Sequence, residues 1–201
     1  MVTMFHEYVA DDTLQLVTAP TYKQIANLWE LRLSNPCEVQ YAFADVSPTF
    51  HEFLAGMESS EILCALTEDT TGEIVTAAWL HDLEQDRQKI ARMGWLGGYA
   101  HPKHRGQHSV MASHLLLNYF EELGVRHIHA SVHVENRPTQ LFLRCKSMLG
   151  FTKVCDYANW TTFGGEPADF VIYTRHPQDR RLAWTCANQL AAKRSLSTLP
   201  L

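Results

Sequence analysis

The stretch YAHPKHRGQHSVMASHLL, residues 99–116, joins an extended segment to an apolar helical pattern through a short polar turn. A strand that enters a helix in this way leaves the first backbone N–H groups of the helix without partners inside the helix. The helix dipole adds about half a positive charge at the same end, so such junctions bind anions and especially phosphate. The turn contains one glycine, Gly106. The stretch therefore predicts either an anion-binding loop or a plain strand-to-helix connection.

The rest of the chain alternates between strand and helix patterns. Strands are expected over residues 14–18, 61–69, 72–82, 89–100, 125–134, 152–158 and 169–175, with Thr70, Thr71 and Gly72 as a hairpin turn and 159–168 as a loop. Helices are expected from Pro20 to residue 33, over 47–57 with Ser47 as cap and Pro48 in the first turn, from the opening stretch to Leu123, and from Pro138 to Gly150. This order predicts one α/β (α+β) domain over residues 1–176. Its central sheet is expected to be mixed, mostly antiparallel and flanked by helices.

Residues 177–201 form a separate C-terminal tail in this interpretation. Leu182, Cys186 and Leu190 lie on one stripe of a predicted helix with basic residues at both ends. An apolar stripe of this kind usually packs against its own domain. The alternative is that the tail docks on a partner, either a second copy of the chain or another protein.

Composition argues against several classes of function. The 201 residues carry a formal charge of −5, so nucleic acid is not an expected partner. No apolar run approaches the roughly 20 residues that span a bilayer, and the start MVTMFHEYVADD has no signal-peptide pattern, so no membrane association is expected. The cysteines are odd in number and scattered, which favours a reduced, cytoplasmic compartment without a disulfide framework: they are Cys37, Cys64, Cys145, Cys155 and Cys186.

Three segments resemble motifs of the Gcn5-related N-acetyltransferase (GNAT) superfamily. The segment from Ala100 to Val110 resembles the acyl-CoA loop of that family, V-x-P-x-x-R-G-x-G-x-G/A. Asn136 follows a strand as in the family motif, and the LGF of residues 149–151 matches the end of the next helix. The resemblance covers about residues 72–175. His108 and Val110 replace two loop glycines, Lys146 stands where the family has a tyrosine, and the usual glutamate of the strand before the loop has no clear counterpart.

The resemblance implies acetyl-CoA, or another acyl-CoA, as cofactor. Loop backbone N–H groups would bind its pyrophosphate, Arg105 would add charge and Ser109 a hydroxyl. Paired Gly97 and Gly98 predict a bulge where the strand separates from its neighbour and the pantetheine lies. Asn136 would contact the pantetheine or cap the helix of Pro138. The expected cofactor-binding residues are Ala100, His101, Arg105, Gly106, Gln107, His108, Ser109, Val110 and Asn136.

Acyl transfer from a thioester to an amine needs a base, a polarised carbonyl and a proton for the departing thiolate. His101 is the first candidate base because its ordinary pKa suits neutral pH. Tyr99, His81 and Asp82 are the other candidates. Tyr157 and Lys146 are candidate acids, whereas Cys145 lacks an evident histidine partner and is interpreted as packing.

No metal site is predicted. His127, His129 and His133 lie on one face of a predicted strand, but no carboxylate or thiolate completes a ligand spacing around them. A polar strand face is the simpler interpretation.

Two functions follow from these patterns. The first is an acyl-CoA-dependent N-acyltransferase, most simply transferring acetyl from acetyl-CoA to a primary amine by direct attack in a ternary complex. The alternative keeps the fold without catalysis, as a structural or interaction protein such as a phage virion component. The amine acceptor would be flanked by residues 34–60 and 156–168, which carry aromatic side chains.

Overall fold

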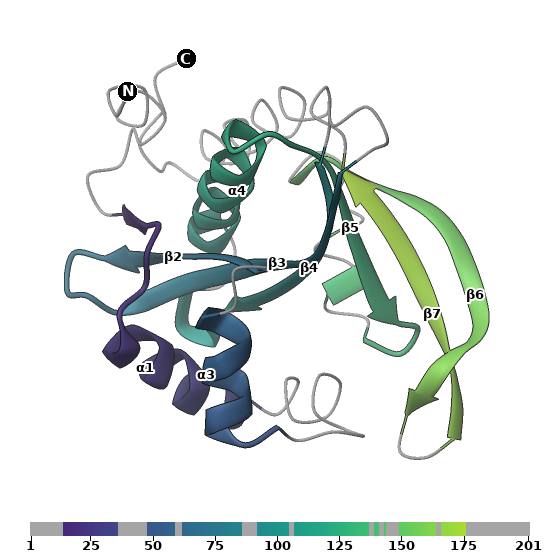
Figure 1. The fold of residues 1–201 in the computed structure, drawn as a ribbon, viewed down its shortest axis with the longest axis horizontal. Coiled ribbons are helices and arrows are strands. Elements are labelled where there is room, and N and C mark those ends of the chain that lie inside the picture. Colours follow the sequence, from purple (N-terminus) through teal and green to yellow (C-terminus); the bar gives the residue numbers. More distant parts are fainter. Residues whose placement is uncertain are drawn as a thin grey trace.

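The chain folds around one seven-stranded sheet in the order β1-β2-β3-β4-β5-β7-β6 (Figure 1). The structure is a computed structural model that describes residues 14–35, 48–58, 62–85, 92–104, 107–136, 139–140, 143, 149–163 and 166–175. The elements in chain order are β1 (Leu14–Val17), α1 (Tyr22–Leu33), α3 (Phe50–Glu58), β2 (Leu63–Asp69), β3 (Ile74–Gln85), β4 (Arg92–Ala100), the 3-10 turn η2 (Pro102–His104), α4 (Gln107–Glu122), β5 (Val125–His133), β6 (Phe151–Phe163) and β7 (Glu166–Arg175). Among the strand pairs of this sheet, β4 with β5 is parallel and the others are antiparallel. The mixed, mostly antiparallel sheet that the sequence predicts is confirmed.

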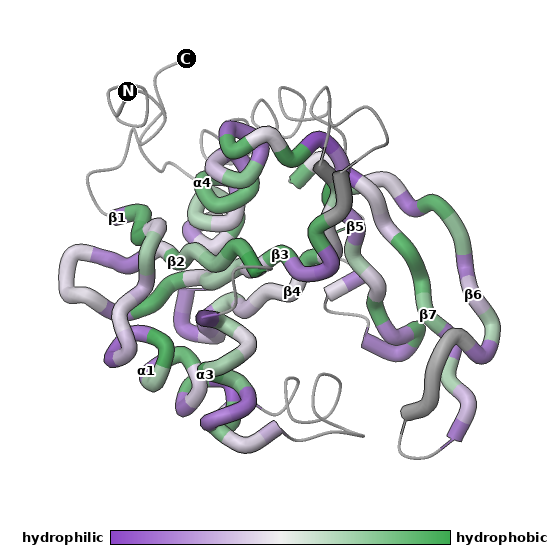
Figure 2. Tube along the Cα trace, in the orientation of Figure 1, coloured by the Kyte–Doolittle hydropathy of each residue, from purple (hydrophilic) through white to green (hydrophobic). Residues whose placement is uncertain are grey.

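Helices cover both faces of the sheet. Helix α4 packs on one face, where Leu116 and Phe120 share a buried cluster with Leu80 of β3. Helices α1 and α3 lie on the other face, where Leu28 and Phe53 belong to a second cluster. Figure 2 shows hydrophobic stretches along α4 and the centre of β3, where these layers meet. Because successive strand residues point to opposite faces, β3 supplies both cores.

The first two helices begin later than the sequence analysis predicts. Thr21 is the N-cap of α1 in a reciprocal capping box with Gln24, so Pro20 precedes the helix. In front of α3, Glu52 Oε2 accepts from the Thr49 N–H at 2.7 Å, and Thr49 Oγ1 accepts from the Glu52 N–H at 3.3 Å. The prediction that Pro48 opens this helix is therefore wrong, and Ser47 lies outside the described residues. A hydroxyl followed three residues later by Glu or Gln satisfies two N–H groups, which proline cannot do.

The predicted loop over residues 159–168 is instead part of a long hairpin. Strands β6 and β7 pair as far as Phe163 and Glu166. The turn-forming residues are absorbed by an irregularity between Tyr157 and Thr161, where Asn159 takes a positive φ of 52°. A bulge accommodates residues that would otherwise end a strand.

Parts of the sequence predictions fall outside the described residues. Most of the helix predicted after Pro138 and the whole tail 177–201 belong there. Among the described residues, no helix is long and apolar enough to cross a membrane.

Candidate active site

Strands β4 and β5 separate in the middle of the sheet. Their parallel pairing runs from Arg92 to Trp95, which faces His129, and no further β4–β5 pair follows among the described residues. Strand β4 nevertheless continues to Ala100 and β5 to His133, as the diverging ribbons in Figure 1 show. Backbone groups of Leu96 to Ala100 therefore have no β5 partner, and helix α4 begins a few residues beyond them. The predicted separation of the strands is confirmed.

The paired glycines have a different role from the predicted bulge. The β3–β4 register is continuous from Ala100 to Trp95, so no bulge occurs at Gly97 or Gly98. A Cβ atom at Gly97 would overlap the indole of Trp79, whereas one at Gly98 would meet only the Ala77 carbonyl oxygen at 3.6 Å. Gly97 is thus required by the close approach of an aromatic ring, and Gly98 leaves the exposed side of the strand unfilled.

The first turn of α4 has the backbone N–H groups of any helix start. Two positions of this turn, His108 and Val110, replace glycines of the family loop, and the structure accommodates them in different ways. Val110 is 1% exposed and belongs to the core cluster beneath α4, so its side chain packs inward. His108 is half-buried, and its ring lies 5.4 Å from that of His104. Ser109 is also buried, which gives no support to a hydroxyl contact with a ligand. Gln107 begins the helix, and Arg105 and Gly106 lie outside the described residues.

Asn136 acts as a cap in this structure. Its Oδ1 accepts from the Thr139 N–H at 3.3 Å, and its carbonyl accepts from the Gln140 N–H at 3.1 Å. The cap interpretation is confirmed, and contact with a pantetheine stays a prediction.

His101 is directed toward the β2–β3 hairpin rather than along the separating strands. Its Nδ1 accepts from the Lys103 N–H at 3.1 Å, and its Nε2 lies 3.7 Å from Glu73 Oε1. Burial lowers the pKa of His101, with opposing attraction from Glu73, so the ring is neutral at pH 7. Tyr99 is buried in the cluster of α1 and α3 and forms part of the core.

His81 is better placed than His101 to act on a ligand between β4 and β5. It lies across from Trp95, the last β4 residue that pairs with β5, and Trp95 in turn faces His129. Residues opposite one another share a face of the sheet, so the three side chains form a row where the strands separate. Strand spacing of about 4.8 Å puts the opening roughly 7 Å from the His81 backbone.

Asp82 holds the His81 ring. The residue takes a positive φ of 51° at an irregularity of β3, and its Oδ2 accepts from His81 Nδ1 at 2.8 Å. In a regular strand the two side chains would point to opposite faces, so this backbone conformation makes the contact. When the His81 ring is neutral and its Nδ1 proton is donated to Asp82, the lone pair is on Nε2. A histidine that acts as a base needs such a free ring nitrogen.

The structure describes one of the two candidate acids. Tyr157 is exposed on β6, the sheet edge separated from β5 by β7. Lys146 lies outside the described residues.

A cavity of about 280 Å³ opens beside His81 on the face covered by α1 and α3. Its walls include Arg32, Glu52, Phe53 and Trp79. The Arg32 guanidinium lies 5.4 Å from the Phe53 ring centre and 4.7 Å from that of Trp79. The cavity therefore combines aromatic walls, a cation and a carboxylate next to a histidine. Sequence analysis singled out His81 but not Arg32 or Trp79.

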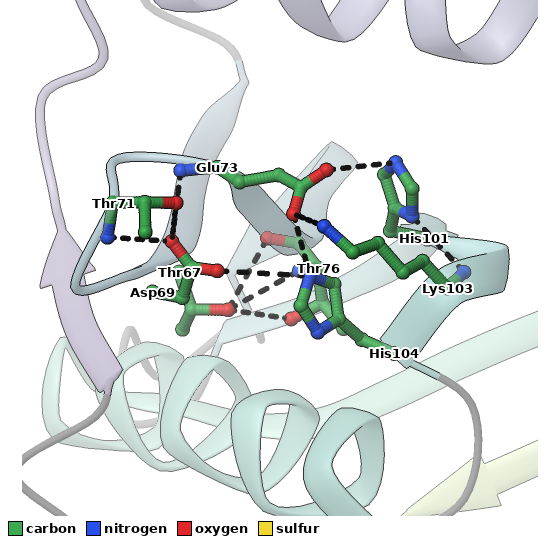
Figure 3. A network of polar contacts seen from close by, with 8 residues as sticks. All are labelled: Thr67, Asp69, Thr71, Glu73, Thr76, His101, Lys103 and His104. Carbon is green, nitrogen blue, oxygen red and sulfur yellow. Dashed lines mark hydrogen bonds and ion pairs between the residues drawn. The ribbon is translucent and has the colours of Figure 1, made fainter.

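A second polar cluster lies at the other end of β4, where η2 meets the β2–β3 turn (Figure 3). Glu73 Oε2 accepts from Lys103 Nζ at 2.7 Å and lies 3.1 Å from His104 Nε2. The Lys103 ammonium and then His104 hold the pKa of Glu73 below its usual range. Sequence analysis missed Glu73. This hairpin residue is distant in the chain from the H-P-K-H of residues 101–104, and no sequence pattern links the two.

Comparison with solved structures identifies the fold. RimJ of Mycobacterium smegmatis, in complex with a CoA disulfide, matches with a TM-score of 0.67 and 16% identity over 91% of this chain and 95% of that chain. Spermidine N-acetyltransferase of Vibrio cholerae, in complex with CoA and spermine, matches with a TM-score of 0.66 and 18% identity over 85% of this chain and 99% of that chain. RimL, a ribosomal L7/L12 α-N-protein acetyltransferase in complex with CoA, matches with a TM-score of 0.64 and 16% identity over 83% and 96% of the two chains. No family model matches the sequence, and no curated protein sequence matches it significantly. The chain has the GNAT fold.

Proposed function

We propose that this protein is an acyl-CoA-dependent N-acyltransferase that transfers acetyl from acetyl-CoA to a primary amine by direct attack in a ternary complex. The observation that carries the proposal is the end of β4–β5 pairing at Trp95 while both strands continue. The opening leads from the start of α4, where helix N–H groups suit a pyrophosphate, to His81 and its cavity. Structural neighbours with CoA in their complexes support an acyl-CoA in this opening.

The residues divide the reaction between them. Backbone groups of Leu96 to Ala100 bind the pantetheine arm. The arm takes the place that β5 would have beside β4 in a closed sheet. The acceptor amine enters through the cavity at Trp79, and His81 Nε2 removes its proton while Asp82 holds the ring. The amine nitrogen then attacks the thioester carbonyl, the C–S bond breaks, and the thiolate takes a proton as CoA leaves.

Thermal unfolding with added acetyl-CoA tests cofactor binding. A hundredfold excess over the dissociation constant stabilises a protein by about 2.7 kcal/mol, which raises the Tm of a 150–250-residue domain by roughly 5–10 °C. No shift at millimolar acetyl-CoA would refute the proposal. A shift without CoA release from any amine in a panel would favour the catalytically silent alternative.

A charge variant tests the position of the phosphates. His108→Glu places a carboxylate at the half-buried first turn of α4 and is expected to weaken acetyl-CoA binding about tenfold, because the carboxylate repels the phosphates. Leu123→Glu, at an exposed position just beyond the other end of the helix, adds the same charge as a control. Equal affinities of the two variants would move the phosphate site away from α4.

A further inference from the structure

The cluster of Glu73, His101 and His104 contains the donor atoms of a metal site. One ligand atom from each of the three residues lies within 4.8 Å of the others. Two imidazole nitrogens and a carboxylate oxygen form a set that Zn²⁺ binds in proteins. We infer that Glu73, His101 and His104 form a binding site for a divalent transition-metal ion, with Zn²⁺ as the best match. This inference does not depend on the proposed acyl transfer.

The local fold explains why the two histidines converge. His101 precedes the 3-10 turn η2 and His104 is its last residue, and the His104 N–H donates to the His101 carbonyl at 3.0 Å. Side chains three residues apart lie on the same side of such a turn. Their rings are accordingly 5.5 Å apart. The H-x-x-H spacing thus becomes a pair of ligands that faces the hairpin carrying Glu73.

The distances fit a tetrahedral ion. Zn–N and Zn–O bonds of 2.0–2.2 Å in a tetrahedron place neighbouring ligand atoms about 3.3–3.6 Å apart. His104 Nε2 lies 3.1 Å and His101 Nε2 lies 3.7 Å from the Glu73 carboxylate, so the observed separations bracket that value. The two distances end at different oxygens of Glu73, so the carboxylate would bind the ion through both oxygens or turn to present one of them to both rings.

Asp69 supports the site from the hairpin. Its Oδ1 accepts from the Glu73 N–H at 3.0 Å, which fixes the backbone of the carboxylate ligand. Its Oδ2 lies 3.9 Å from His104 Nε2, within reach of the fourth position. The carboxylates of Asp69 and Glu73 beside the two imidazoles concentrate negative charge where a cation would bind.

The Lys103 ammonium would compete with a metal ion for Glu73. It contacts Glu73 Oε2 at 2.7 Å, but the side chain is 66% exposed and can move into solvent. His101 must also change tautomer, because its Nδ1 now accepts from the Lys103 N–H. Both steps oppose the metal, so an affinity on the order of micromolar is expected, well below that of structural zinc sites.

Zinc titration of the full chain, stripped of metal with a chelator, tests the inference. Isothermal calorimetry should show one Zn²⁺ per chain, and Glu73→Gln should weaken binding by more than the ~10–100-fold that loss of a supporting group costs. His104→Ala should have the same effect. His127→Ala, at an exposed histidine on β5, is the matched control and should leave the affinity unchanged.

Lys103→Ala distinguishes a metal site from an ordinary polar network. Removing the competing ammonium should strengthen Zn²⁺ binding several-fold, whereas a network that merely links the turn to η2 would gain nothing. Because the Lys103 side chain is exposed, the variant is expected to fold. In a separate measurement, Co²⁺ bound in place of Zn²⁺ should give the visible absorption of a tetrahedral site. The inference is overturned if no Zn²⁺ binds, if Glu73→Gln binds as the wild type does, or if His127→Ala alone abolishes binding.

Discussion

The two edges of β4 meet their neighbours differently. On the β3 side, pairing runs without interruption from Trp95 to Ala100, and an aromatic ring packs on the strand. On the β5 side, pairing stops at Trp95. The same residues thus form half of a closed hairpin and one edge of an opening. Strand β4 itself is regular over this range, so we look to the contacts of β5 for the cause of the separation.

Strand β5 is held by β7 and by helix α4. Arg175 of β7 donates through Nε to Glu121 Oε1 of α4 at 2.9 Å, and both side chains are buried. Arg175 also donates to the Leu149 carbonyl and to Asn118 Oδ1. Because β5 pairs with β7 along Ile128 to His133, this buried contact fixes the strand that separates from β4.

The largest expected effect is catalytic. His81→Ala should lower kcat/KM for acetyl transfer by about 10²–10⁴, the usual contribution of a general base. Steady-state assays of CoA release with His127→Ala as control measure it, and acetyl-CoA affinity should stay unchanged. A His81→Ala enzyme within twofold of wild type would place the base elsewhere along the opening.

Arg175→Met should give the largest loss of stability. It leaves Glu121 buried without its cation, which costs about 3–5 kcal/mol in comparable sites. Urea unfolding measures the change. Lys153→Met is the control, because its ion pair with Asp156 is exposed and such pairs contribute only about 0–1 kcal/mol. Similar losses in both variants would mean that the buried contact does not hold this half of the sheet.

The paired glycines of β4 test how closely β3 packs against this strand. Gly97→Ala should destabilise the fold by about 1–3 kcal/mol, because the new methyl group overlaps the Trp79 indole. Gly98→Ala should stay within about 0.5 kcal/mol of wild type, since its Cβ meets only ordinary contacts. Thermal unfolding of the two variants compares them, and the reverse order would contradict the packing described.

The smallest expected effect concerns the cap of α3, a helix that lines the cavity. The Thr49 N–H and then its hydroxyl hold the pKa of Glu52 below the ordinary 4.5. A lowered folded-state pKa means that this stabilisation is present above pH 4.5 and is lost as the pH falls through the folded value. Glu52→Gln removes the titration, so its acid-unfolding curve should differ slightly from wild type below pH 4.5. A change of pH dependence near neutrality would contradict this origin.

Local patterns predicted most of the fold. Period-2 alternation located the strands, and the apolar spacing after residue 106 located α4, because burial on one face imposes these periods. The errors of prediction lie at the ends of helices and strands. Thr21 and Thr49, and not the predicted residues, cap α1 and α3, because a capping box satisfies two N–H groups. Residues 159–163 and 166–168 belong to strands β6 and β7, because a bulge accommodates the turn-forming residues.

The sequence by itself determined the strand-to-helix junction and the order of elements, since both depend on residues close along the chain. Only the tertiary structure decided which groups act together. Glu73 meets His104, and His81 faces the point where β4 and β5 separate, through strand register and not through sequence spacing. The face that each strand residue takes follows the local hydrophobic pattern, but the point at which β4 and β5 stop pairing depends on segments that η2 and α4 separate in the chain.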